Sequence, residues 1–455
     1  MLDFAKLVAD QRAYFLTQAT KPYAFRLSQL KKLEGWISTN ADAILAALQA
    51  DLGKSAYEGY LTEVAMVKQE LKDAIRSLKK WMKPRRARTA IGQLPGTCRM
   101  YAEPYGVALI MSPWNYPFQL TIAPLIGAIS AGNCAVVKPS AYSAATSALI
   151  KRMMDELFDP QYIAAVEGGR KENAGLLEQH FDFIFFTGSP NVGRLVMEKA
   201  SVHLTPVSLE LGGKSPVIVD ETADIALTAK RLAWGKCVNA GQTCVAPDYV
   251  LVHRSRETEL VEALIAELRR MYTSAPLTNP DWPKIINEHH FSRLVGLLQS
   301  GVVSHGGQIN GQTRQIAPTL LTDVSWDDPV MQEEIFGPLL PILTYSKLDD
   351  AIAQIQQRPK PLALYLFTRS AETEARVMRE VSFGGGCIND TVLHLATPYM
   401  PFGGVGESGM GGYHGKFSFD AFSHVKSVLK RWAKPDVTLR YAPYDGKMKW
   451  IKSIM

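Results

Sequence analysis

The chain has 455 residues, and this length predicts more than one packed unit, since single hydrophobic cores stop growing beyond about 250–300 residues. Hydrophobic residues make up 47% and charged residues 21%, values that are typical of globular proteins and exclude a largely disordered chain. The net charge of +6 is spread over both halves, and the densest basic run, residues 79–88, is short. The charge therefore does not indicate nucleic-acid binding.

The cysteine pattern indicates a reducing compartment. The cysteines are five in number, widely spaced, and without a C-x-x-C pair or a histidine at zinc-finger spacing. They predict neither a disulfide framework nor a metal site. Residues 1–15 mix charged with apolar residues and lack the apolar core of a signal peptide, so we expect a cytoplasmic protein. The five are Cys98, Cys134, Cys237, Cys244 and Cys387.

No segment of the sequence predicts an integral membrane span. The most apolar stretch, residues 107–137, is interrupted by Pro113, Pro117 and Pro124. The C-terminal segment KMKWIKSIM is too short to span a bilayer, although its sequence leaves contact with a membrane surface open.

The pattern of apolar and polar residues changes twice in the first half of the chain. Residues 1–82 have helical periodicity almost throughout, and residues 83–102 interrupt it with Pro and Gly before an alternating, extended segment. From Tyr105 onward short apolar runs alternate with helices, which we expect at residues 120–130 and 143–158. Strands that are apolar on both faces and separated by helices predict a parallel, doubly wound sheet.

A second alternating series predicts another α/β unit. It begins at residues 215–220, continues through a helix at residues 223–238, and ends near the glycine-rich FGGGCIND. The tail from residue 421 to 441 is again extended, and we pair it with the 83–102 segment. The predicted units are 1–82 with 103–211, then 212–420, and a small β element formed by 83–102 and 421–445.

Cys244 is a candidate nucleophile. It lies in NAGQTCVAPDYV, between a predicted helix and a predicted strand, where a thiol is open to a ligand and the backbone can present an N–H. Free cysteines are more often buried and inert. The cysteine alone therefore does not decide between the two roles.

Glu210 is a candidate general base. It ends an apolar strand and precedes two glycines, and a carboxylate between Leu209 and Leu211 should have a raised pKa. The alternative is a structural carboxylate that caps the amides of Gly212 or Gly213. We group Leu211 with the cofactor-binding residues.

Asn115 is a candidate oxyanion donor. It follows the first strand of the sheet, between Trp114 and Tyr116, where its amide could donate to a developing negative charge. An asparagine before a helix is more often a plain cap, and position does not separate the two.

Residues for a dinucleotide cluster at other strand ends. Lys138 ends the strand AVVK, where its amine could reach ribose hydroxyls. In FFTGSPNVGR, Gly188, Ser189 and Gly193 lie where a strand becomes a helix, whose free N–H groups attract a pyrophosphate. A G-x-G-x-x-G match that begins at Gly404 lacks the strand–turn–helix context, so we reject it as a dinucleotide fingerprint.

Glu334 and Phe336, in QEEIFGPLLPI, provide an acid for ribose hydroxyls and an aromatic ring for a flat ligand. By themselves they are equally a surface acid and a core phenylalanine.

In this order and spacing, these segments resemble the aldehyde dehydrogenase superfamily over nearly the whole chain. The resemblance implies Cys244 as nucleophile, Asn115 with the Cys244 N–H as oxyanion hole, and Glu210 as the base for hydrolysis. It assigns the dinucleotide residues as a set: Lys138 to the adenosine ribose, Gly188 and Ser189 to the pyrophosphate, and Glu334 with Phe336 to the nicotinamide ribose and ring. The resemblance also implies roles for the three predicted units. They are a Rossmann-like cofactor-binding domain (1–82 and 103–211), a catalytic domain (212–420) and a bridging element for oligomerisation (83–102 and 421–445).

The chain is similar to the class 3 group, through DLGKSAYEGYLTEV, FDFIFFTGSPNVG and the glycine-rich PFGGVGESGMGGYHGK. This resemblance implies a homodimer and suggests His414 as a residue near the substrate pocket, although a structural histidine is equally compatible. Members that favour NAD often have a glutamate where this chain has Ala141, so we expect NAD or NADP as cofactor.

The substrate is expected to be a small-molecule aldehyde, aromatic or medium-to-long-chain aliphatic, because Trp114 and Tyr116 lie in an apolar neighbourhood. Both rings could also serve packing alone. Two other functions remain open: a dehydrogenase that passes the thioester to coenzyme A, and a catalytically silent structural protein with this fold.

Overall fold

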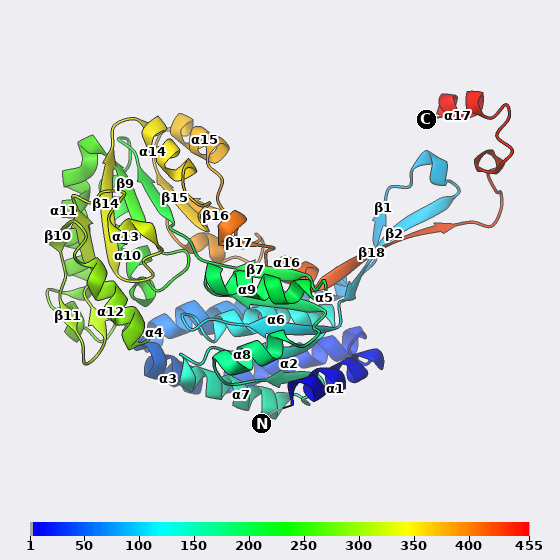
Figure 1. Ribbon diagram of the computed structural model, residues 1–455, viewed down its shortest axis with the longest axis horizontal. Helices are drawn as coiled ribbons and strands as arrows, with labels where there is room; N and C mark the ends of the chain where they lie inside the picture. Colours follow the sequence, from blue (N-terminus) through cyan, green and yellow to red (C-terminus); the bar gives the residue numbers. More distant parts are fainter. Residues whose placement is uncertain (1–2, 455) are drawn as a thin grey trace.

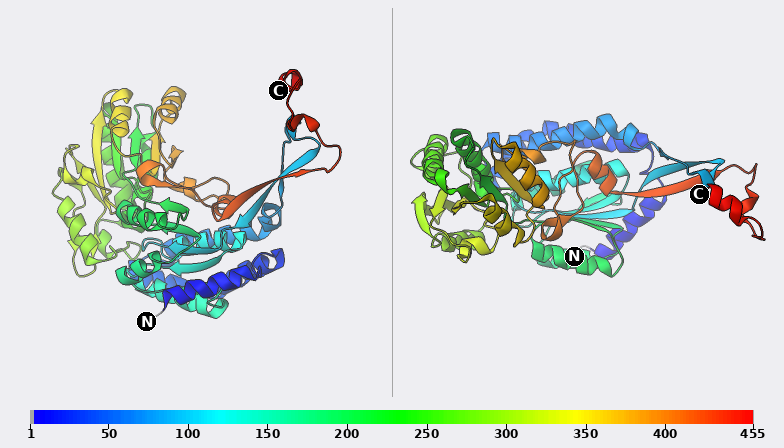
Figure 2. Two further views of the ribbon diagram at one scale, coloured as in Figure 1. Left: turned by 45° about the vertical axis from the view of Figure 1, so that its right-hand side comes forward. Right: turned by 90° about the horizontal axis from the view of Figure 1, so that it is seen from above.

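The computed structural model describes residues 3–454 and consists of a body with two α/β units and a long arm that projects from it (Figure 1). Helix α17 (Met448–Ile454) lies at the outer end of this arm in all three views (Figures 1 and 2). None of the helices among residues 3–454 is both long and apolar enough to cross a bilayer.

The N-terminal region is helical, as predicted from its periodicity. Its helices bury leucine, isoleucine and valine side chains against the first sheet and its covering helices. A short π-helical turn, Tyr60–Val64, interrupts the last part and carries Glu63 inward. The helices are α1 (Phe4–Leu16), α2 (Tyr23–Thr39), α3 (Ala41–Leu52), α4 (Ala56–Gly59) and α5 (Ala65–Trp81).

The first sheet has six strands in the order β17-β7-β6-β3-β4-β5. All but β17 run parallel, which confirms the predicted doubly wound sheet. Every residue of β3, β4 and β6 is buried, and this explains their unbroken apolar sequences. The parallel strands are β3 (Val107–Met111), β4 (Cys134–Lys138), β5 (Ile163–Ala165), β6 (Phe183–Thr187) and β7 (Val207–Glu210); the connecting helices are α6 (Gln119–Ala131), α7 (Ala144–Leu157), α8 (Arg170–Leu177) and α9 (Pro190–Ser201).

The register of this sheet gathers the candidate residues at one edge. Lys138 pairs with Met111, and Glu210 pairs with Thr187, so all of these strands end at the same level. In a parallel sheet this carboxyl edge is where ligands bind.

The second unit is a seven-stranded sheet in the order β10-β13-β14-β9-β8-β15-β16, parallel except for β10. It begins and ends at the segments that the sequence predicts. The strands are β8 (Pro216–Val219), β9 (Tyr249–His253), β10 (Val302–His305), β13 (Thr319–Thr322), β14 (Leu339–Tyr345), β15 (Ala363–Phe367) and β16 (Gly385–Ile388), with a small hairpin of β11 (Ile309–Asn310) and β12 (Gln315–Ile316). The helices are α10 (Ile225–Cys237), α11 (Glu257–Tyr272), α12 (Glu288–Leu297), α13 (Pro329–Gln332), α14 (Leu348–Gln356) and α15 (Ala371–Glu380).

After β16 the chain returns to the first sheet. The short strand β17 (Gly409–Met410) pairs antiparallel with β7, and the Leu211 N–H donates to the Ser408 carbonyl at 3.1 Å. The glycine-rich loop that contains the G-x-G-x-x-G match therefore lies beside the strand of Glu210, without a following dinucleotide-type helix.

The arm is a three-stranded antiparallel sheet of β1 (Arg85–Ala87), β2 (Gly96–Pro104) and β18 (Ser423–Arg431), which follows α16 (Lys416–Ala421). The predicted pairing of the two extended segments is confirmed, with β18 in register along the whole of β2. The tail is extended over a shorter range than predicted. Arg431 pairs with Gly96, where β2 begins, so the chain beyond it has no strand partner and forms a 3₁₀ turn at Thr438–Arg440 and helix α17 (Met448–Ile454).

Candidate active site

Cys244 lies on a tightly held loop between α10 and β9. Asn239 and Ala240 have positive φ angles of 53° and 51°, an uncommon conformation for non-glycine residues. The Gln242 side chain braces the loop, since its Nε2 donates to the carbonyls of Asn239 (3.0 Å) and Lys284 (3.1 Å). The loop that presents the thiol is therefore fixed before any ligand binds.

The thiol of Cys244 is half-buried and free. Burial, and then the nearby carboxylates of Glu334 and Glu210, raise its pKa to about 12. A thiol with such a pKa is protonated at neutral pH and needs a proton acceptor or a cation beside it to become a nucleophile.

Asn115 reaches the cysteine loop from the β3–α6 connection. Its Nδ2 donates to the Gln242 carbonyl at 3.1 Å, and its backbone carbonyl accepts from Asn239 Nδ2 at 2.8 Å. Its Oδ1 has no hydrogen-bond partner among residues 3–454. Asn115 is not the cap of α6, whose N-cap is Phe118. The capping alternative is therefore wrong, and the amide lies against the loop that carries Cys244.

A buried ion pair supports Asn115, and the sequence analysis missed it. Lys54 Nζ lies 2.6 Å from Glu63 Oε1 and donates to the Asn115 carbonyl at 2.9 Å, with both charged side chains fully buried. The other Glu63 oxygen caps α6 by accepting from the N–H groups of Phe118 (2.9 Å) and Gln119 (3.1 Å). The motif DLGKSAYEGYLTEV holds both charges, and its π-helical turn, Tyr60–Val64, contains Glu63.

Glu210 ends β7 and is 2% exposed. Burial raises its pKa well above the ordinary value of 4.5, as predicted. Neither carboxylate oxygen has a hydrogen-bond partner within the described residues, so the alternative of a cap on Gly212 or Gly213 is wrong. A buried carboxylate without a partner is costly to stability, and it is the arrangement that a general base requires.

Several polar groups lie at the edge of the first sheet. The Lys138 amine donates to the carbonyls of Pro139 (2.8 Å) and Gly168 (2.6 Å), and burial lowers its pKa to about 8. Ser189 is the N-cap of α9 and makes no side-chain cap bond, which leaves the first N–H groups of the helix open. The buried Thr187 hydroxyl is also without a partner in the part of the chain described.

Glycines allow close packing at this edge. A Cβ on Gly188 would lie 2.5 Å from the Phe186 ring, and one on Gly193 would lie 2.7 Å from a Leu211 methyl group. Leu211 therefore holds α9 against the sheet from beneath. This contact places Leu211 behind the helix that would receive a pyrophosphate.

Glu334 and Phe336 come from the second unit. The Glu334 carboxylate lies so close to Gly212 that a Cβ there would be 2.0 Å from Oε2, and burial raises the Glu334 pKa to about 8. Phe336 has a positive φ of 49°, and its ring meets Trp114 edge-on at 5.3 Å between centroids. Phe336 thus lies beside Trp114, the residue before Asn115.

Tyr116 and His414 are both buried. The Tyr116 hydroxyl lies 2.6 Å from the hydroxyl of Thr243, the residue before Cys244, and Lys54 Nζ lies 3.9 Å from the centre of the Tyr116 ring. His414 Nδ1 lies 2.6 Å from a Glu70 oxygen, and the ring stacks on Tyr413. These contacts favour the structural alternative for His414.

The residues present fit a nicotinamide dinucleotide. The open end of α9, the unpartnered Thr187 hydroxyl, the amine of Lys138 and the Glu334 carboxylate all lie at or near the carboxyl edge of the first sheet. No group of side chains within residues 3–454 has the composition of a metal site. A cysteine, a partnerless base and an amide donor beside such an edge have the parts for oxidation through a covalent thioester.

Comparison with known proteins assigns the chain. Residues 2–428 match the model of the aldehyde dehydrogenase family. The chain belongs to this family. It is therefore an enzyme that oxidises aldehydes to carboxylic acids, and the catalytically silent alternative is wrong.

The similar relatives include class 3 enzymes, as the sequence motifs indicated. A 4,4'-diaponeurosporen-aldehyde dehydrogenase from Staphylococcus aureus is 50% identical, covering 98% of this chain and 97% of the relative. Aldehyde dehydrogenase family 3 member H1 from Arabidopsis thaliana is 46% identical, covering 99% and 94%. A substrate-bound structure of Staphylococcus aureus AldH superimposes with a TM-score of 0.98 at 49% identity, covering 100% of this chain and 99% of that one.

The comparisons also bear on the cofactor. An NAD-dependent aldehyde dehydrogenase from Sinorhizobium meliloti has a TM-score of 0.86 at 27% identity, covering 96% of this chain and 88% of its own. The fold is also that of an NADP-dependent enzyme from E. coli, with a TM-score of 0.87 at 22% identity, covering 94% and 90%. Solved structures with this fold thus include one named as NAD-dependent and one named as NADP-dependent.

Proposed function

We propose that this enzyme oxidises aromatic or medium-to-long-chain aliphatic aldehydes through a thioester on Cys244. The observation that carries the proposal is the convergence of Cys244, the Asn115 amide and the unpartnered Glu210 carboxylate. In the first step the thiolate attacks the aldehyde carbon, and the oxygen of the resulting thiohemiacetal is held by Asn115 Nδ2 and the Cys244 N–H. A bound nicotinamide supplies the hydride acceptor and a positively charged ring.

Glu210 removes the proton of the hydrolytic water in this scheme. Its raised pKa makes it a strong enough base to accept a proton from the attacking water that hydrolyses the thioester. Transfer of the thioester to coenzyme A would not need this base. The presence of Glu210 therefore favours hydrolysis, and stimulation of turnover by coenzyme A would favour the acylating alternative.

The cofactor site is proposed to accept both NAD and NADP. Ala141 is exposed just beyond the end of β4, where Lys138 is poised for the adenosine ribose. Without a carboxylate at position 141, nothing at that position repels a 2′-phosphate. Lys138, Gly188, Ser189 and Glu334 would hold the dinucleotide, and Leu211 and Gly193 would support α9 beneath it.

Several features support an apolar substrate. The Trp114 and Phe336 rings meet edge-on beside the loop of Asn115, and Tyr116 contacts the residue before Cys244. The relative from Staphylococcus aureus is named for one aldehyde, 4,4'-diaponeurosporen-aldehyde. For the present chain we propose a class of substrate only.

The enzyme is proposed to be a cytoplasmic homodimer. Its arm ends in β18, an edge strand of nine residues with Val425, Val428 and Leu429 exposed. An open edge of this length pairs readily with another strand, and a second copy is its natural partner. All five cysteines are free, which is compatible with a reducing compartment.

The test measures the formation of reduced cofactor by its absorbance, with benzaldehyde and a series of aliphatic aldehydes and with NAD and NADP in parallel. Wild type should turn over, and Cys244→Ala should not. Turnover that survives in Cys244→Ala would refute the covalent mechanism.

A further inference from the structure

Positive charge is concentrated at one end of the molecule. Residues 83–104 and 423–455, which form the arm and the chain beyond it, have thirteen Lys and Arg against three Asp and Glu. The other 400 residues have 37 Lys and Arg against 41 Asp and Glu, so the body is negative. The linear sequence conceals this separation, because the two segments lie in opposite halves of the chain and come together through the pairing of β2 with β18.

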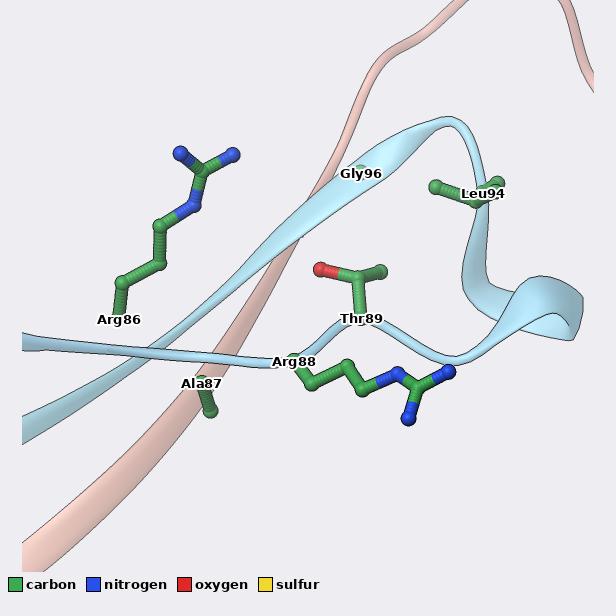
Figure 3. A pocket seen from close by; sticks show the side chains of 6 residues that line it. All are labelled: Arg86, Ala87, Arg88, Thr89, Leu94 and Gly96. Carbon is green, nitrogen blue, oxygen red and sulfur yellow. The ribbon is translucent and has the colours of Figure 1, made fainter.

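The positively charged side chains at the hairpin of the arm are exposed to solvent. Arg86 and Arg88 line a hollow beside the turn of the hairpin, and their side chains extend away from the strand (Figure 3). Within the described residues neither guanidinium forms an ion pair. The hollow lies on the arm, which projects away from the two α/β units of the body (Figure 1).

Beyond the arm, the C-terminal tail (residues 432–454) combines this charge with exposed apolar side chains. Six large ones within twenty residues are each at least 40% exposed. A set of this density is unusual for a surface that faces only water. They are Trp432, Tyr441, Tyr444, Met448, Trp450 and Ile451.

Helix α17 separates the two kinds of side chain. At about 100° per residue, Met448, Trp450 and Ile451 fall within one arc of about 160°, while Lys449 and Lys452 fall on the opposite side. A short basic helix with tryptophan on its apolar face is the pattern of a segment that lies in a bilayer interface.

We propose that the tail docks the enzyme on an anionic lipid bilayer. Tryptophan and tyrosine prefer the headgroup level, and lysines beside them contact the phosphates while their stems cover apolar surface. The negative body is repelled by the same surface, so the charge separation turns the arm end of the molecule towards the bilayer. A second copy would pair with the edge of β18, because that edge offers main-chain groups. The tail has no strand, so it offers a second copy no such edge.

The experiment is cosedimentation of the full chain with phosphatidylcholine vesicles, with and without phosphatidylglycerol, at low and high salt. The variant Lys447→Gln/Lys449→Gln/Lys452→Gln removes three charges. A control, Lys31→Gln/Lys32→Gln/Lys230→Gln, removes three exposed charges from the body. Because each lysine contributes about fivefold to binding at an anionic surface, the tail variant should bind about 100-fold more weakly.

Wild type and the body control should bind the anionic vesicles, and high salt should release both. A second variant, Trp450→Ala/Ile451→Ala, should also lose binding while retaining activity on a water-soluble aldehyde. Equal binding to neutral vesicles, no binding to either, or unchanged binding of the tail variant would overturn the proposal. A tail variant that dissociates the oligomer without any vesicle binding by wild type would instead identify the tail as a contact between copies.

Discussion

Replacing Asn115 with alanine should damage catalysis far more than stability. The side chain makes one hydrogen bond, from Nδ2 to the Gln242 carbonyl at 3.1 Å, and its Oδ1 has no partner among the described residues. Loss of one such bond costs about 1 kcal/mol. The Gln242 carbonyl keeps a second donor, Asn239 Nδ2 at 3.1 Å, so no buried acceptor is left unpaired.

The catalytic cost is larger because, in the proposed mechanism, the amide donates to an oxygen that becomes charged only as the reaction proceeds. Loss of one oxyanion donor costs about 2.7–4 kcal/mol, so Asn115→Ala should lower kcat by about 10²–10³-fold. Initial rates of cofactor reduction at saturating aldehyde measure this loss. Thermal unfolding measures the effect on stability, which should be a fall of no more than about 4 °C.

Asn133→Ala is the matched control. Asn133 is also buried, but it lies at the opposite edge of the sheet, where Nδ2 donates to the Phe422 carbonyl at 2.9 Å and Oδ1 accepts from the Gly106 N–H at 2.9 Å. Its removal leaves two backbone groups unpaired, at about 1–3 kcal/mol each, and should lower stability with little effect on kcat. The reasoning is refuted if Asn115→Ala retains kcat within about threefold, or if both variants lose kcat equally.

Three other variants test the remaining parts. Because the pKa of Glu210 is raised, its basic form accumulates as pH rises, and steady-state turnover should increase with pH. Glu210→Gln should abolish that increase and leave only an initial burst of reduced cofactor. The same raised pKa means that the folded state holds this proton more tightly than the unfolded state does, so wild type loses stability as pH rises above the ordinary value of 4.5. Glu210→Gln should therefore be more stable than wild type in thermal unfolding, by a margin that grows with pH. An equal or lower midpoint for the variant would contradict this. Ala141→Glu should raise the KM for NADP by about tenfold with little effect on NAD, and unchanged KM values would remove position 141 from the account. Lys54→Met leaves the Glu63 carboxylate buried alone and should cost about 3–5 kcal/mol of stability, which a denaturant titration measures; a loss below about 1 kcal/mol would contradict the role of the pair.

The sheets and the candidate residues could be predicted from local pattern. Unbroken apolar runs such as those of β3 and β4 occur because both faces of the strands are covered, and their ends then locate Lys138 and Glu210. The pairing of β2 with β18 was also predictable, because each segment alternates and neither fits the α/β pattern around it.

Other features depend on contacts that no local pattern records. Lys54 and Glu63 are charged residues in a helical region, which normally face water, and only the packing of Asn115 over them explains their burial. The choice between a cap and an oxyanion donor for Asn115 required the position of the Gln242 carbonyl, which comes from the other α/β unit. The clustering of charge on the arm required the pairing of segments from the two halves of the chain.

The central claim is that Cys244 forms the thioester and that Glu210 hydrolyses it. The most direct test is mass spectrometry of Glu210→Gln, quenched in acid soon after mixing with benzaldehyde and cofactor. We predict a benzoyl adduct on the peptide that contains Cys244, at close to one per active chain. No adduct, or an adduct on Cys387 instead, would contradict the account.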